Sequence, residues 1–257
     1  MSPYAASIYY TLSPASENDP PLLLLHGAGG SRLSWPPLLR RLSGRVVYTL
    51  DLPAHGRSAG PACDLIPAYA AKVAEWMQAL SLPPAVIVGH SMGSAIALTL
   101  ALEHPDRVQA LVLIGGGARL RVHPSLLEWT KRPETLEQAI QTLLEWGFGP
   151  NSPQALKDLA AQHMRQTPPL TFHADFLACD RFDVRDRLVE IFHPTLILCG
   201  TEDRMTPPRF SEFLAENLPN AHLQMIENAG HMLMLEQPQV VKEAIHTFLQ
   251  AQSTGNP

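Results

Sequence analysis

Short hydrophobic runs recur along the chain, with segments of helical spacing between them. Most of these runs are almost continuously apolar, which is typical of strands in a parallel sheet whose two faces are both covered by helices. The first run is more polar and is expected at an edge of the sheet. The expected strands are residues 7–13, 21–27, 46–53, 85–91, 110–116, 194–200 and 221–228.

Helical patterns alternate with these strands. Residues 67–80, 207–218 and 238–250 each repeat apolar side chains every three or four positions, so each presents one hydrophobic face. Alternation of strands and helices is the pattern of an α/β protein with right-handed crossovers. The chain is therefore predicted to form a doubly wound, mostly parallel α/β sheet.

One interval, residues 118–190, interrupts the alternation because it contains helical patterns and no convincing strand. It carries considerable apolar bulk, including Trp129 and Trp146. We expect this interval to be a helical insertion that follows the strand ending near Gly115. Residues 1–117 and 191–257 would then form a single core domain, and the chain is long enough to bury a sizeable core.

The composition, 46% hydrophobic and 17% charged over 257 residues, is that of a well-packed globular protein. The net charge of −5 comes without a basic block, which argues against nucleic acid or an anionic membrane as a partner. The three cysteines show neither metal-binding spacing nor a disulfide framework. The first basic residue is Arg32, so no signal peptide is indicated. We expect a cytoplasmic protein without a metal.

A single serine, Ser91, stands between two glycines in the stretch AVIVGHSMGSAIALTLAL, where a buried strand becomes an apolar helix. Side chains at 89 and 93 would collide as strand and helix approach each other, which explains both glycines. The tight turn would leave the serine oxygen exposed, and the helix N-terminus would favour a developing oxyanion. A tight turn can show this pattern without chemistry, but the strand before it and the helix after it favour a nucleophile.

A nucleophilic serine needs a base, and His231 is the best candidate. It follows the strand 221–228 in the sequence NAGH, at the same edge of the sheet as Ser91. His222 begins that strand at the opposite end, and His246 lies on the last helix, so neither is suitably placed.

The acid that orients the base should occupy an equivalent loop. Asp203 comes three residues after Gly200, just past another buried strand, and Glu202 beside it is the alternative. The remaining aspartates of this part of the chain are interpreted as helix caps or surface charges: Asp175, Asp180, Asp183 and Asp186.

A glycine-rich loop, HGAGGS, follows the strand 21–27 and leaves its backbone bare. The N–H groups of Ala28 in this loop and of Met92 after the serine are the expected oxyanion donors. The loop lacks the Lys-Ser/Thr pair of a phosphate-binding P-loop and the GxGxxG pattern of dinucleotide folds. Phosphate binding is therefore the weaker interpretation.

Several motifs together resemble the α/β-hydrolase superfamily, and specifically a cap-bearing serine esterase. They are HGAGGS (26–31), DLPAHGRS (51–58), GHSMGS (89–94), GTED (200–203) and NAGH (228–231). The resemblance covers nearly the whole chain, although Ala54 stands where relatives commonly have glycine. It implies a cap, inserted after the sixth strand, that serves as a lid over the site. His26 and His90 lie inside these motifs and are expected to be structural.

The resemblance implies a catalytic triad of Ser91 as nucleophile, Asp203 as acid and His231 as base. It also implies an oxyanion hole formed by the N–H groups of Ala28 and Met92. Such a site suits acyl transfer without a cofactor, and relatives that open epoxides or displace halides carry a carboxylate at this position. The expected substrate is a small to medium apolar carboxylic ester, cleaved through an acyl-enzyme.

The substrate pocket and the reaction have further candidates. The pocket residues we expect are Gly27, Trp129, Trp146, Met205 and Met232. A C–C bond hydrolase, a lactonase and a perhydrolase with the same triad remain alternatives, as does a receptor-like binding protein of the same fold with little turnover. The expected partner is a small molecule, and the protein is expected to be a monomer or homodimer.

Overall fold

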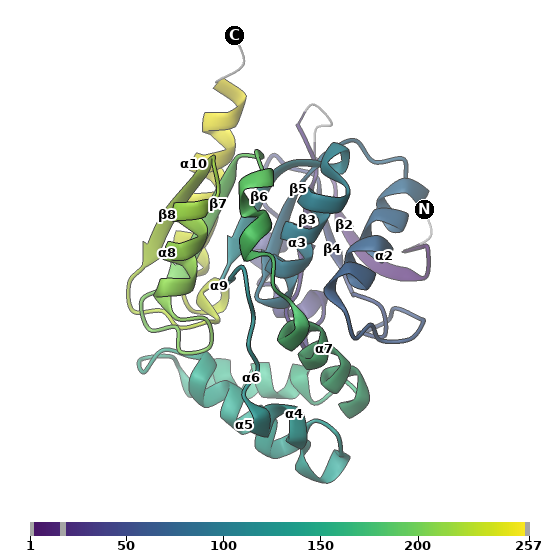
Figure 1. The fold of residues 1–257 in the computed structure, drawn as a ribbon, viewed down its shortest axis with the longest axis vertical. Helices are drawn as coiled ribbons and strands as arrows, with labels where there is room; N and C mark the ends of the chain where they lie inside the picture. The colour runs from purple at the N-terminus through teal and green to yellow at the C-terminus, as the bar shows by residue number, and fades with distance from the viewer. Residues whose placement is uncertain (1–2, 16–18, 255–257) are drawn as a thin grey trace.

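A mostly parallel sheet of eight strands forms the centre of the computed structural model, which describes residues 3–15 and 19–254 (Figure 1). Its spatial order is β1-β2-β4-β3-β5-β6-β7-β8; β2 pairs antiparallel with β1 and β4, and the other pairs are parallel. The predicted doubly wound sheet is confirmed, with the short β1 added at its edge. The strands are β1 (Tyr4–Ala5), β2 (Ile8–Ser13), β3 (Leu22–Leu25), β4 (Val47–Leu50), β5 (Ala85–His90), β6 (Val108–Ile114), β7 (Thr195–Gly200) and β8 (Ala221–Ile226).

Helices cover both faces of the sheet because successive side chains of each strand point to opposite faces. Leu23 and Ile87 pack with α2, α3 and α8, whereas Leu22 and Val86 pack with α1, α9 and α10. The covering helices are α1 (Pro37–Arg40), α2 (Ile66–Ala79), α3 (Met92–Glu103), α8 (Pro208–Asn217), α9 (Leu233–Glu236) and α10 (Pro238–Thr254). Two 3-10 turns, η1 (Arg32–Ser34) and η2 (Pro105–Arg107), complete the connections.

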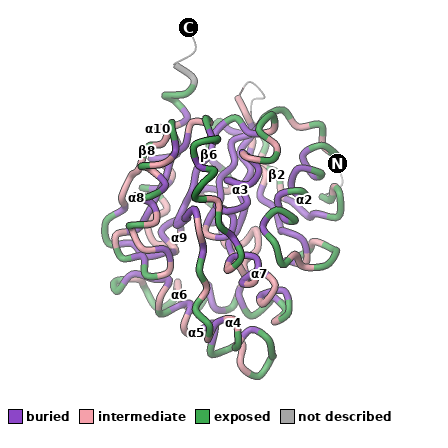
Figure 2. Tube along the Cα trace, viewed as in Figure 1, coloured by how far each residue is buried: buried purple, intermediate pink, exposed green. Residues whose placement is uncertain are grey.

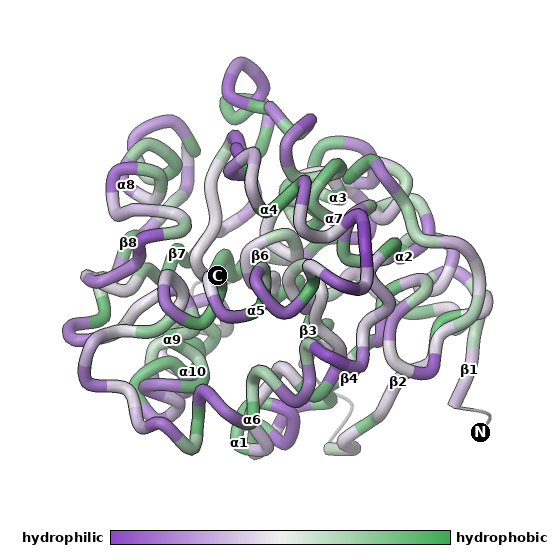
Figure 3. Tube along the Cα trace, turned by 90° about the horizontal axis from the view of Figure 1, so that it is seen from below, coloured by the Kyte–Doolittle hydropathy of each residue, from purple (hydrophilic) through white to green (hydrophobic). Residues whose placement is uncertain are grey.

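Helix α3 is apolar on all sides because it lies deep in the molecule. Every residue from Met92 to Ala101 is buried, and the helix contacts α2, β5 and β6 (Figure 2). In contrast, α8 at the surface has both hydrophilic and hydrophobic segments (Figure 3). Across the described residues, no helix has both the length and the apolar character that a membrane crossing needs.

Four helices and a 3-10 turn follow β6, and the four helices form a layer below the sheet (Figure 1). Many apolar side chains of the four helices form a further hydrophobic cluster, whereas Ala178, Cys179 and Leu188 belong to the core cluster that includes α2 and α3. The division into domains at 118 and 190 stays a prediction; below, residues 118–190 are called the inserted segment. Its elements are α4 (Pro124–Trp129), α5 (Pro133–Gly147), α6 (Gln154–Met164), α7 (Pro169–Arg181) and η3 (Arg185–Glu190).

Candidate active site

Ser91 occupies the turn between β5 and α3 with φ 54° and ψ −116°, in the left-handed region that strains a residue with a side chain. A Cβ on Gly89 would lie 2.2 Å from the carbonyl oxygen of Gly93, and one on Gly93 would lie 2.2 Å from that of Leu25. Both positions are therefore closed to side chains, as the sequence predicts. The Ser91 N–H is held by the carbonyl oxygen of Ile114 at 2.9 Å.

His231 and Asp203 are both buried, and the distance from His231 Nδ1 to Asp203 Oδ2 is 2.9 Å. The other carboxylate oxygen accepts the N–H groups of Met205 and Thr206, each at 2.8 Å. Burial by itself raises the pKa of Asp203, but the charge of His231 and the hydrogen bonds from His231 and Thr206 outweigh it and keep the pKa below its usual value. An ionised Asp203 keeps the proton of His231 on Nδ1 and leaves Nε2 as the acceptor. Glu202, the alternative acid, is exposed.

Thr206 adds a hydroxyl that the sequence analysis missed. Its Oγ1 lies 2.8 Å from Asp203 Oδ2, 3.1 Å from His231 Nδ1 and 2.9 Å from the carbonyl oxygen of Gly115. The hydroxyl ties the acid and the base to the end of β6. Its signal in the sequence is the spacing Asp-x-x-Thr, which lets an aspartate accept the N–H of the residue three positions later.

His90 and His26 hold backbone groups on either side of Ser91. Burial, and then the charge of His231, lower the pKa of His90 to about 3, so neutral His90 donates from Nε2 to the carbonyl oxygen of His231 at 3.0 Å. Burial also lowers the pKa of His26 to about 3. The N–H of Leu52 donates to His26 Nε2 at 3.0 Å, so the proton of the His26 ring is on Nδ1. This Nδ1–H donates to the carbonyl oxygen of Gly27 at 2.8 Å. Both histidines have the structural contacts expected of them.

The two expected oxyanion donors follow the neighbouring strands β3 and β5. Neither the N–H of Ala28 nor that of Met92 donates to another described residue. Ala28 lines the cavity beside Ser91, and Met92 is the first residue of α3 with its side chain in the core. Both N–H groups therefore lack a partner among the described residues, as expected of oxyanion donors, and their use by a ligand stays a prediction.

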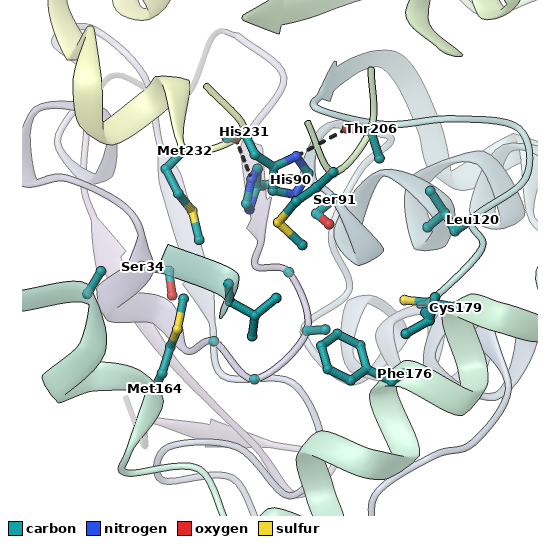
Figure 4. Close-up of a pocket in the computed structure, with 18 of the residues that line it drawn as sticks. Ser34, His90, Ser91, Leu120, Met164, Phe176, Cys179, Thr206, His231 and Met232 are labelled. Atoms are coloured by element: carbon teal, nitrogen blue, oxygen red, sulfur yellow. Dashed lines mark hydrogen bonds between the residues drawn. The ribbon is translucent and has the colours of Figure 1, made fainter. Parts of the chain in front are cut away.

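A cavity of about 100 Å³ is lined by both Ser91 and His231 (Figure 4). Three of the predicted pocket residues, Gly27, Met205 and Met232, line it. Its lining is largely apolar. From the inserted segment, Leu120, Leu143, Met164, Phe176 and Cys179 face it, and its polar side chains include Ser34, Arg121 and His163. The Ser91 hydroxyl opens onto this space and makes no hydrogen bond to another described residue.

A family model described as alpha/beta hydrolase fold matches residues 20–238. The chain belongs to the alpha/beta hydrolase family. It is 33% identical over 249 residues to a Caulobacter vibrioides protein named "Putative carbamate hydrolase RutD", which covers 89% of this chain and 90% of the relative. The structure of a thermophilic esterase is 30% identical, with a TM-score of 0.80 over 95% and 98% of the two chains. The enol-lactonase from Burkholderia xenovorans LB400 has a TM-score of 0.90 over 96% and 100% of the chains, but at 23% identity it shows the fold alone.

Two predicted pocket residues of this alpha/beta hydrolase, Trp129 and Trp146, do not line the cavity. Both are half-buried and pack against the hydrophobic cluster of the inserted segment. The Trp146 ring also meets the ring of His123 edge-on, with centroids 5.5 Å apart. Aromatic bulk can stabilise the packing of helices or line a pocket, and composition does not distinguish the two.

The interpretation of Asp175 as a helix cap or surface charge is wrong. Asp175 is completely buried on α7, where Oδ2 accepts the N–H of Gly29 at 2.8 Å and lies 2.8 Å from His55 Nε2. Its Oδ1 accepts the hydroxyl of Tyr69 at 2.5 Å. A buried carboxylate is tolerated only with such partners, and all of these come from the core of the hydrolase. The inserted segment is therefore joined to the core by a buried polar network.

The pair of His55 and Asp175 makes stability depend on pH. His55 Nδ1 lies 2.9 Å from the carbonyl oxygen of Pro53, so both ring nitrogens face oxygens and the protonated imidazole satisfies both. Burial by itself lowers the pKa of His55, but the charge of Asp175, its hydrogen bond and the charge of Asp51 outweigh burial and raise the pKa above 6.5. The ion pair of His55 and Asp175 therefore contributes its full amount to the free energy of unfolding below about pH 6.5. This contribution is lost as the pH rises through the raised pKa of His55.

We therefore expect the free energy of unfolding to fall as the pH is raised through this range. Urea unfolding of the wild type at several pH values measures the slope. The Asp175→Asn variant, which cannot hold the charged pair, should show a flatter profile over the same range. Parallel profiles for the two proteins would contradict the ion pair.

Proposed function

We propose that this alpha/beta hydrolase is a serine hydrolase that cleaves small to medium apolar carboxylic esters through an acyl-enzyme on Ser91. The observation that carries the proposal is that Ser91 and His231 line the same largely apolar cavity. His231 is also hydrogen-bonded to the buried Asp203. The 30% identity to a thermophilic esterase supports the same class of reaction. In this proposal the inserted segment acts as a cap over the site.

In the first half of the reaction, the oxygen of Ser91 attacks the ester carbonyl carbon while Nε2 of His231 takes the serine proton. Asp203 stabilises the imidazolium that forms and keeps its ring oriented. The carbonyl oxygen becomes an oxyanion and accepts the N–H groups of Ala28 and Met92. Collapse of the tetrahedral intermediate breaks the bond to the alcohol, which leaves with the proton from His231.

In the second half, water replaces the alcohol. His231 takes a proton from the water molecule while the water oxygen attacks the acyl carbonyl carbon. The N–H groups of Ala28 and Met92 then stabilise the second oxyanion. His231 then returns the proton to the oxygen of Ser91, and the carboxylic acid is released. No step needs a group beyond this chain, the ester and water.

The size of the cavity predicts a preference for short chains. A series of p-nitrophenyl esters from acetate to palmitate should give the highest kcat/KM at a short or medium acyl chain, because a cavity of about 100 Å³ cannot enclose a long one. Each methylene that fits adds up to about 0.8 kcal/mol of burial, and each that does not fit adds none. Release of p-nitrophenol measures the rates.

The same assay tests the competing functions. Lactones and vinylogous diketones, assayed beside the esters, should be turned over more slowly than the best ester. Faster turnover of a diketone or a lactone would replace the ester proposal with a C–C hydrolase or a lactonase. Absence of both a burst and turnover with every ester, together with unchanged ligand binding by Ser91→Ala, would indicate a binding protein.

A further inference from the structure

The loop that carries Ala28 has little rigidity of its own, because three of its four residues from 27 to 30 are glycine. An oxyanion donor contributes to catalysis only when it already points at the position where charge develops. The contacts of this loop with the rest of the molecule must therefore supply its rigidity. Those contacts come from both the core and the inserted segment.

The inserted segment holds the backbone of Gly29 from two sides. Asp175 Oδ2 accepts the N–H of Gly29 at 2.8 Å, and the hydroxyl of Thr167 donates to the carbonyl oxygen of Gly29 at 2.9 Å. Thr167 lies just before α7, the inserted helix that contacts α3 (Figure 1). All three residues are buried, so water does not compete for these hydrogen bonds.

The ring of Phe172, also on α7, packs against Gly29. Gly29 has a φ of 65°, and an added Cβ there would lie 2.1 Å from this ring. The loop is therefore held by hydrogen bonds and packing that both originate in α7 and the turn before it.

The core holds the preceding peptide group. The carbonyl oxygen of Gly27 accepts His26 Nδ1–H at 2.8 Å and the N–H of Gly30 at 3.1 Å. Because a trans peptide is planar, this carbonyl and the N–H of Ala28 point in opposite directions along one plane. The two peptides that flank Ala28 are thus fixed by different parts of the chain, the first by His26 and the second by Asp175.

We propose that Thr167 and Asp175 are positioning residues, through which the inserted segment aims the N–H of Ala28 at the oxyanion. The inference rests on the proposed function and deepens it. The inserted segment then does more than enclose the substrate, because it completes the oxyanion hole. Asp175 is itself fixed by His55 and Tyr69, so the network passes from the core through α7 and back to the loop.

Thr167→Val tests the inference, because valine has nearly the shape of threonine and carries a methyl group in place of the hydroxyl. We expect kcat on the best p-nitrophenyl ester to fall about tenfold, less than the loss of an entire oxyanion donor, with KM within about twofold of the wild type. Thr167→Ser, which keeps a hydroxyl, should recover most of the rate. Thr130→Val is the matched control, since this buried threonine of the inserted segment donates to the carbonyl oxygen of Leu126, away from the loop.

A thionoester separates positioning from a general loss of structure. Its sulfur accepts hydrogen bonds weakly and gains less from N–H donors than oxygen does. The substitution Thr167→Val should therefore slow hydrolysis of the thionoester less than hydrolysis of the ester. The ratio of the ester rate to the thionoester rate should then be lower in the variant than in the wild type. The inhibition constant of a trifluoromethyl ketone, which forms the tetrahedral adduct, should rise in parallel with the loss of kcat/KM.

Two results would overturn the inference: an unchanged ester rate in folded Thr167→Val, or equal losses on ester and thionoester. If Thr167→Val does not fold, the same rate ratio in Asp175→Asn decides, because an amide cannot accept hydrogen bonds from all three donors that surround the carboxylate. A wild-type protein that hydrolyses none of the esters overturns the proposed function as well. An active wild type with an unaffected Thr167→Val overturns the positioning role alone.

Discussion

Ser91→Ala is expected to lower kcat for p-nitrophenyl esters by about 10,000-fold or more, because no other group can form the acyl-enzyme. The initial burst of p-nitrophenol should disappear with the steady-state rate. The fold should be retained, since alanine meets the same left-handed φ of 54° as serine and loses no hydrogen bond of the side chain. Stopped-flow release of p-nitrophenol measures both phases.

Ser125→Ala provides the control for this variant. Ser125 lies on α4, outside the cavity, and its replacement should leave the rate within about twofold of the wild type. Circular dichroism and the midpoint of thermal unfolding show whether each variant is folded. Substantial ester turnover by folded Ser91→Ala would rule out the nucleophile.

Asp203→Asn is expected to lower kcat by about 10,000-fold while leaving the site assembled. The N–H groups of Met205 and Thr206 would retain the amide oxygen at the Oδ1 position, which turns the NH₂ group toward His231 Nδ1. A donor in that place favours the wrong tautomer, with the proton on Nε2, so the imidazole can no longer take the serine proton.

Glu202→Gln is the matched control, because the neighbouring carboxylate is exposed. We expect its kcat within about twofold of the wild type. The reverse order, with Glu202→Gln severe and Asp203→Asn mild, would make Glu202 the acid. Steady-state kinetics on one ester, measured for both variants under the same conditions, decides between them.

The starts of helices account for part of the 24 prolines of the chain. Several helices begin with a proline in their first turn, where its missing N–H costs nothing and its fixed φ suits the helix. The high proline content therefore marks helix starts, including three within the inserted segment: Pro124, Pro133 and Pro169. The backbone also accounts for the departure at Ala54, which has a φ of 66°, a conformation that favours the glycine common in relatives.

The sequence alone determined the sheet, the turn at Ser91 and the loops that carry Asp203 and His231. These features are local: hydrophobic runs specify buried strands, glycines permit close backbone approach, and parallel strands bring the loops at their carboxyl ends to one edge. Residues far apart in the chain could therefore be assigned to one site without knowing any contact between them.

The contacts of Asp175, Thr167 and Thr206, and the positions of Trp129 and Trp146, could be known only from the folded structure. Asp175 lies 146 positions from Gly29 in the chain, and nothing near it in the sequence shows that it is buried against the glycine-rich loop. Whether a polar side chain faces water or a buried partner depends on how the helices pack together. Hydrophobic periodicity specifies which face of a helix is buried, but not which element packs against that face. The packing of α7 on the core therefore makes Asp175 a link between the inserted segment and the glycine-rich loop.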